Sequence, residues 1–131
     1  MIKLINPVLW QGVTVLDYLE LAREIVNTLE DKKAENILLL DLRPTGIIAD
    51  FFIICTGNSD RQIKALAESV REVVKTNHQV LPNGVEGENT SGWMLMDYGN
   101  VVVHIFDDER RRYYDLESFW QKHSNVLVSI Q

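Results

Sequence analysis

Residues 93–106 read WMLMDYGNVVVHIF, and this stretch decides the fold because it predicts a β-hairpin. The second strand, VVVHIF, is almost wholly apolar, which predicts that it is buried. The first strand begins with two bulky residues, Trp93 and Met94, and runs into Asp97 and Tyr98 at the turn. Large apolar and ring-bearing side chains beside acids are typical of a surface that binds another protein. The same side chains also suit a hydrophobic core, and the pattern alone leaves both interpretations open.

The segments around this hairpin alternate between helical and extended patterns. Apolar residues recur at helical spacing in two segments, and each segment is preceded by a Ser or Thr with capping-box spacing. Continuous apolar runs predict two strands between these helices, and a short apolar pair predicts an edge strand after the second helix. The expected elements are a helix from Thr14, strands at 36–42 and 51–56, a helix capped by Ser59, an edge strand at Val80-Leu81, the hairpin, a short helix opened by Asp107 and a last segment at 116–123.

This order of elements predicts a single α/β domain. A helix between the second and third strands allows a parallel pair, whereas the hairpin is antiparallel. We therefore expect a mixed β-sheet of about five strands flanked by helices. The chain has 131 residues, the size of one domain, and we place that domain at residues 14–123. Residues 1–13 are expected to form an N-terminal extension, and residues 124–131 an apolar tail that packs back on the domain or joins two copies in a homodimer.

Charge and composition limit the classes of partner. The formal net charge is −6, from 13 Lys and Arg against 19 Asp and Glu, which argues against a free-standing nucleic-acid-binding protein. An acidic balance suits a basic protein partner, although it also serves solubility alone. The single cysteine excludes an internal disulfide, and no apolar run reaches the roughly 18 residues of a membrane span. Because Pro7 interrupts the apolar N-terminus, we expect no signal peptide and a cytoplasmic protein without membrane contact.

Few residues are arranged for catalysis. The turn Gly57-Asn58-Ser59 lies between a strand and a helix, where it either binds a phosphate or simply caps the helix. No Walker motif follows it, and no predicted strand carries the paired carboxylates that hold magnesium in a nucleotidyltransferase. Cys55 and His104 lie on apolar strands, which favours core positions over a nucleophile and a base. The three histidines lack ligand spacing, so neither a metal nor another cofactor is expected.

Two long blocks of sequence resemble the Iojap family, also called the ribosomal silencing factor (RsfS) family. They are ADFFIICTGNSDRQIKALAE, residues 49–68, and GVEGENTSGWMLMDYGNVVVHIFDDERRRYYDLESFW, residues 84–120. The resemblance implies a fold similar to nucleotidyltransferases without the catalytic acids, and no enzymatic activity. It also implies binding to large-subunit ribosomal protein number fourteen, at the face where the small subunit docks. A protein bound there blocks subunit joining and represses translation, notably when nutrients are short.

Carried over from the family, the docking region falls on the hairpin and the segment after it. Ring-bearing and apolar residues are expected to anchor the partner, and acids to orient it. The residues concerned are Trp93, Met94, Asp97, Tyr98, Glu86, Glu88, Asp107 and Tyr113, with Tyr114 as an addition. Two other functions stay open: a large-subunit assembly factor with peripheral rRNA contacts through Arg110–Arg112, and a nucleotide-using transferase built on the Gly57 turn.

Overall fold

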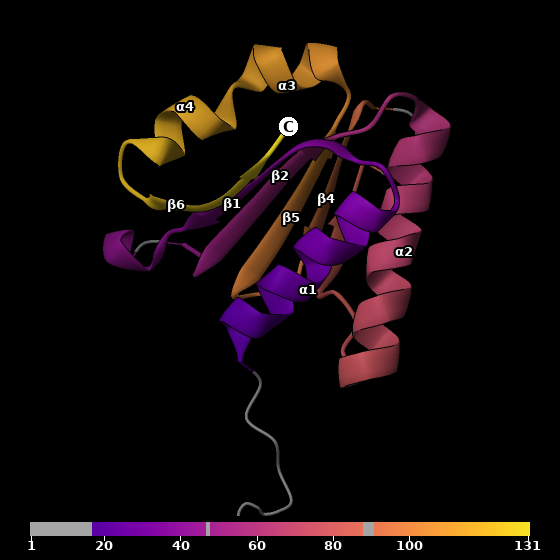
Figure 1. Ribbon diagram of the computed structural model, residues 1–131, viewed down its shortest axis with the longest axis horizontal. Helices are drawn as coiled ribbons and strands as arrows, with labels where there is room; N and C mark the ends of the chain where they lie inside the picture. The colour runs from indigo at the N-terminus through magenta and orange to yellow at the C-terminus, as the bar shows by residue number, and fades with distance from the viewer. Residues whose placement is uncertain (1–16, 47, 88–90) are drawn as a thin grey trace, which may run out of the picture.

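The computed structural model describes residues 17–46, 48–87 and 91–131, which form eleven helices and strands (Figure 1). In chain order these are α1 (Tyr18–Asp31), β1 (Glu35–Asp41), the short 3-10 helix η2 (Arg43–Thr45), β2 (Phe51–Thr56), α2 (Asp60–His78), β3 (Gly84–Glu86), β4 (Trp93–Asp97), β5 (Val101–Phe106), α3 (Asp108–Tyr114), α4 (Leu116–Gln121) and β6 (Asn125–Ile130).

The six described strands form one mixed sheet in the order β3-β4-β5-β2-β1-β6. β2 and β5 are parallel and are joined by the crossover that contains α2, while the other neighbours are antiparallel. The prediction of a mixed α/β sheet flanked by helices is therefore confirmed, with one strand more than expected.

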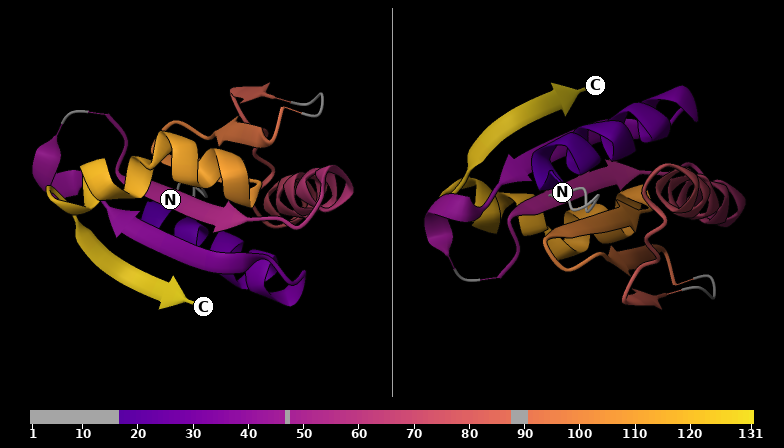
Figure 2. Two further views of the ribbon diagram at one scale, coloured as in Figure 1. Left: turned by 90° about the horizontal axis from the view of Figure 1, so that it is seen from above. Right: turned by 90° about the horizontal axis from the view of Figure 1, so that it is seen from below.

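Helices cover both faces of this sheet, as Figures 1 and 2 show. α1 and α2 pack on one face, where the residues of β5 that point inward are Val101, Val103 and Ile105. α3 and α4 lie on the opposite face, where Leu116 and Trp120 pack against Phe52 and its neighbours. Because side chains alternate along a strand, His104 points to this second face together with Val102 and Phe106.

Two elements begin at residues other than those that the sequence predicts. α1 begins at Tyr18 and its N-cap is Asp17, whose carboxylate accepts the backbone N–H groups of Leu19 and Glu20, so the helix does not begin at Thr14. The edge strand lies at Gly84–Glu86 and not at Val80-Leu81, because it is defined by pairing with β4. Residues 1–13, predicted as an extension, lie outside the described residues.

The C-terminal tail is also part of the domain. Residues Asn125–Ile130 form β6, which pairs with β1 along the edge of the sheet, so the expected boundary after His123 is wrong. Leu127, Val128 and Ile130 pack against the core on the α1 side. The apolar tail packs back on the domain, as predicted, and it does so by pairing with β1 as a strand.

Candidate protein-docking surface

The register of three strands brings the candidate residues to one face of the sheet. β4 pairs with β5 so that Trp93 lies opposite Phe106 and Leu95 opposite His104. β3 adds Glu86 opposite Leu95. Residues opposite each other in a β-ladder point to the same side, so these side chains share the face that carries α3.

Trp93 is the centre of an aromatic cluster on this face. Its ring stacks on Phe106 with centroids 5.0 Å apart, and the ring of Tyr114 in α3 lies 4.7 Å away. The indole Nε1–H donates a hydrogen bond of 3.2 Å to Nδ1 of His104. Trp93 is partly exposed and Tyr114 is 47% exposed, so the aromatic cluster extends from the core to the protein surface.

A pocket of about 220 Å³ opens beside this cluster. Its lining consists of Glu86, Gly87, Ser91, Trp93, Leu95 and Tyr114. Two rings and a leucine form the apolar part of its lining, while Glu86 is exposed and supplies a carboxylate. We name this set the docking pocket.

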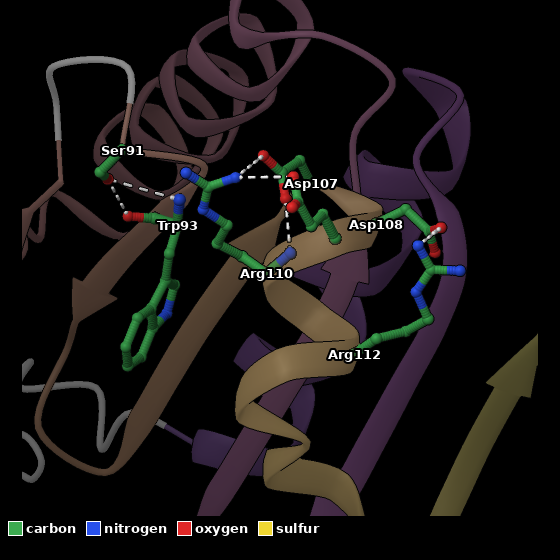
Figure 3. Close-up of polar contacts among 7 residues, drawn as sticks. Ser91, Trp93, Asp107, Asp108, Arg110 and Arg112 are labelled. Atoms are coloured by element: carbon green, nitrogen blue, oxygen red, sulfur yellow. Dashed lines mark hydrogen bonds and ion pairs between the residues drawn. The ribbon is translucent and has the colours of Figure 1, made fainter.

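The backbone beside the pocket requires glycine. Gly87 has φ +82°, and a Cβ there would lie 1.9 Å from the carbonyl oxygen of Trp93. Ser91 donates from Oγ to the same carbonyl at 2.9 Å (Figure 3). These contacts hold the chain on both sides of residues 88–90 against the start of β4.

The predicted acids differ in their environment. Asp107 caps α3, where its Oδ1 accepts the backbone N–H of Arg110 at 2.7 Å, so its first role is local. Asp97 accepts the backbone N–H of Gly99 at 2.7 Å and thereby shapes the hairpin turn. Glu86 lies in the docking pocket, whereas Glu88 lies outside the described residues.

Two of the predicted contact residues are buried. Met94 is 4% exposed and Tyr98 is 7% exposed, and both belong to the core beneath α1 and α2. Both residues face the side of the sheet opposite to Trp93 and so lie away from the docking pocket, and a partner contact through them stays a prediction. Tyr113, by contrast, is 80% exposed and packs edge-on against Tyr114.

The sequence interpretation missed other apolar surface on the same side. Leu95 lines the docking pocket, and Phe119 of α4 is 59% exposed and contacts Trp120. The alternation of side chains in β4 contained a signal for Leu95, since it lies two residues after Trp93.

The arginines of α3 are paired with carboxylates. Arg112 reaches Asp108 at 3.3 Å (Figure 3). Arg110 reaches Glu109 at 3.0 Å. Arg111 faces a polar cavity of about 380 Å³ between α3, α4 and the β1–β6 edge. It donates to Glu117 at 3.0 Å and also to backbone and side-chain oxygens of β1 and β2. These pairs offset the positive charge that a contact with phosphate needs.

The residues considered for catalysis occupy structural positions. Cys55 is fully buried, and burial raises the pKa of its thiol to about 12, which keeps it protonated. The Gly57 turn is filled by its own cap: Ser59 Oγ accepts the backbone N–H of Gln62, and Gln62 in turn donates to the carbonyl of Lys33. Within the described residues no cluster of three His, Cys, Asp or Glu side chains could hold a metal ion.

The described helices include none that is long and apolar enough to cross a membrane. The fold and the pocket together describe a single-domain mixed α/β protein that carries aromatic rings and a carboxylate in a pocket on one face of its sheet.

Comparison with known proteins identifies the family. A family model described as "Ribosomal silencing factor during starvation" matches residues 16–131. The ribosomal silencing factor RsfS of Halalkalibacterium halodurans is 41% identical over 101 residues, which cover 77% of this chain and 86% of that protein. The protein of the same name from Bacillus subtilis is 42% identical over 91 residues, covering 70% of this chain and 76% of that protein. This chain therefore belongs to the ribosomal silencing factor family.

The solved structures agree with this assignment. A crystal structure of a Chromobacterium violaceum protein superposes with a TM-score of 0.76 at 37% sequence identity. The superposition covers 81% of this chain and 88% of that one.

Proposed function

We propose that this protein silences ribosomes by binding the large subunit through a basic ribosomal protein, number fourteen in the large subunit, and so excluding the small subunit. The observation that carries the proposal is the docking pocket, which combines aromatic walls with a carboxylate on a domain of the silencing factor family. Steric exclusion needs a docking surface and no reacting group.

The pocket suits a lysine or arginine side chain of the partner. Such a side chain has an apolar stem and a cationic head, and the rings of Trp93 and Tyr114 attract the head when it lies within about 6 Å. Glu86 adds a carboxylate to the same pocket. Aromatic residues in partly enclosed sites are the usual anchors of protein interfaces, and truncating one costs on the order of 2 kcal/mol or more, about thirtyfold in affinity.

The net charge supports the same kind of partner. Acids exceed bases by six over the whole chain, and the arginines of α3, the helix that carries Tyr114, are already paired. A basic partner would be steered toward this face, and salt would slow the encounter.

Co-sedimentation with separated ribosomal subunits tests the proposal directly. The purified protein should migrate with the large subunit on a sucrose gradient, and adding the small subunit should then give fewer joined ribosomes. Trp93→Ala should weaken both effects, with about a thirtyfold loss of affinity, while Leu81→Ala, a truncation of an exposed apolar residue outside the pocket, is the control. If the wild-type protein binds neither subunit, the proposal is wrong; if Trp93→Ala binds normally, the pocket is not the docking site.

A further inference from the structure

His104 is a polar residue in an otherwise apolar strand. It lies in the middle of β5 and is only 3% exposed, with Phe52 at a ring distance of 4.8 Å on one side and Trp93 and Phe106 on the others. The catalytic interpretation of this residue has no support, since no charged group appears among its described partners. Its place beneath the docking pocket therefore calls for another explanation.

The hydrogen bond with Trp93 determines the tautomer of His104. An indole Nε1–H is a donor only, so Nδ1 of the imidazole must be the unprotonated acceptor and the proton must lie on Nε2. Burial lowers the pKa of His104 to about 4, so the ring is neutral and the acceptor is present at pH 7.

The second ring nitrogen of His104, Nε2, lowers the stability of the folded protein. Nε2 is buried and has no hydrogen-bond partner among the described residues. An unpaired buried donor is unfavourable, and an apolar side chain of similar shape would avoid the cost. A residue that lowers stability at this depth is more easily understood if it serves the surface above it.

Ring packing alone does not orient Trp93. The indole stacks on Phe106 at an interplanar angle of 21°, which defines the plane of the ring. Stacking leaves open which edge of the indole faces inward, because turning the ring over by about 180° keeps the same plane. The bond from Nε1 to His104 selects one of these two orientations.

We propose that His104 is a positioning residue for docking, whose Nδ1 atom holds the Trp93 indole in the single orientation that forms the wall of the docking pocket. The inference rests on the proposed function, because the pocket must bind a partner for the orientation to matter. Without the acceptor, the partner would have to select one indole orientation from two, which lowers its affinity.

Two substitutions of nearly equal shape separate orientation from packing. His104→Asn places an amide oxygen close to the position of Nδ1, whereas His104→Leu has the same branching and no acceptor. Leucine suits the apolar surroundings better, so His104→Leu should be at least as stable as His104→Asn. Binding to the large subunit should follow the opposite order, with His104→Leu weaker than wild type by about twofold, because the competent indole orientation falls from nearly full to about half occupancy. His104→Asn should lie between the two.

The hydrogen bond itself has a separate signal. The chain contains three tryptophans, and the indole N–H resonance of Trp93 is the one that disappears in Trp93→Phe. This resonance should shift in His104→Leu and stay closer to its wild-type position in His104→Asn. Val102→Ala, a truncation in the same strand and face, should leave both the resonance and the binding near wild type.

Each outcome decides the proposal. Weak binding by a stable His104→Leu together with recovery in His104→Asn supports positioning. Wild-type affinity in His104→Leu, or equal losses in both variants, overturns it while leaving the proposed function intact. If the wild-type protein fails to bind the large subunit, the proposed function fails and takes this inference with it, although the indole resonance still reports whether the hydrogen bond exists.

Discussion

Mild acid should destabilise this protein through His104. Burial lowers the pKa of this imidazole from 6.5 to about 4, and no neighbouring charge contributes to the shift. In the unfolded chain the same ring takes up a proton as the pH falls below about 6.5. Between these two values the unfolded state binds more protons than the native state, so the free energy of unfolding decreases as the pH falls. The contribution is fully present above pH 6.5 and is lost by about pH 4.

The two pKa values give the size of the effect. One pKa unit corresponds to about 1.4 kcal/mol, so the whole shift is worth roughly 3 kcal/mol. Two-state linkage places about 2 kcal/mol of this loss between pH 7 and pH 5. Asp41 acts in a lower range: the hydrogen bond from Arg43 lowers the pKa of this carboxyl below 3.8, so its contribution disappears only in stronger acid.

Urea unfolding at pH 7 and pH 5 measures the effect, with His104→Leu as the reference. The variant cannot titrate at this position but keeps His78 and His123, so the difference between the two proteins isolates His104. We expect the wild-type protein to lose about 2 kcal/mol more than the variant on going from pH 7 to pH 5. Equal losses in the two proteins would refute the reasoning and would mean that His104 is solvated or charged in the native state.

Three further predictions concern the docking pocket and the ion pair between Arg111 and Glu117. Glu86→Lys should weaken binding to the large subunit and reduce the dependence of this binding on salt, measured by co-sedimentation at several salt concentrations. Glu109→Lys on α3 is a control with the same charge change outside the pocket. Equal losses of binding in the two variants would indicate only an effect of net charge. Gly87→Ala should displace the start of β4, since its Cβ would lie 1.9 Å from a backbone oxygen, and the indole resonance of Trp93 should move; an unchanged spectrum would contradict this. Arg111→Met should lower the free energy of unfolding by about 3 kcal/mol, because it leaves the Glu117 carboxylate without its partner. Urea unfolding measures this change, and a loss below about 1 kcal/mol would show that the ion pair contributes little to stability.

Much of the fold could be predicted because local signals agreed with the tertiary structure. The apolar runs of β2 and β5 are buried along their whole length, and the capping box at Ser59 begins α2 as expected. β3 was missed because Gly84–Glu86 carries no strand pattern of its own and exists through its pairing with β4. The boundary after His123 was misplaced for a similar reason, since the apolar β6 is recognisable as a strand only beside β1.

The docking surface was only partly predictable from sequence. The hairpin was located correctly, but its residues divide between two faces of the sheet, and a single sequence does not state which face carries which helices. Met94 lies in the core formed with α1 and α2, while its neighbour Trp93 lies beside α3. Tyr114 joins Trp93 only because α3 folds back over β5, a contact between distant parts of the chain.

The docking pocket therefore depends on the strand register of β4. A shift by one residue would turn Trp93 into the core and bring Met94 to the surface, because successive side chains point to opposite faces. Contacts at the start of the strand oppose such a shift: the backbone N–H of Asp107 donates to the carbonyl of Gly92 at 2.8 Å, and Ser91 holds the carbonyl of Trp93. A Cβ at Gly92 would lie 2.3 Å from the Asp107 carboxylate, so this position also requires glycine. Gly87 and Gly92 thus serve the pocket indirectly, since they help to fix the side of the sheet on which Trp93 lies.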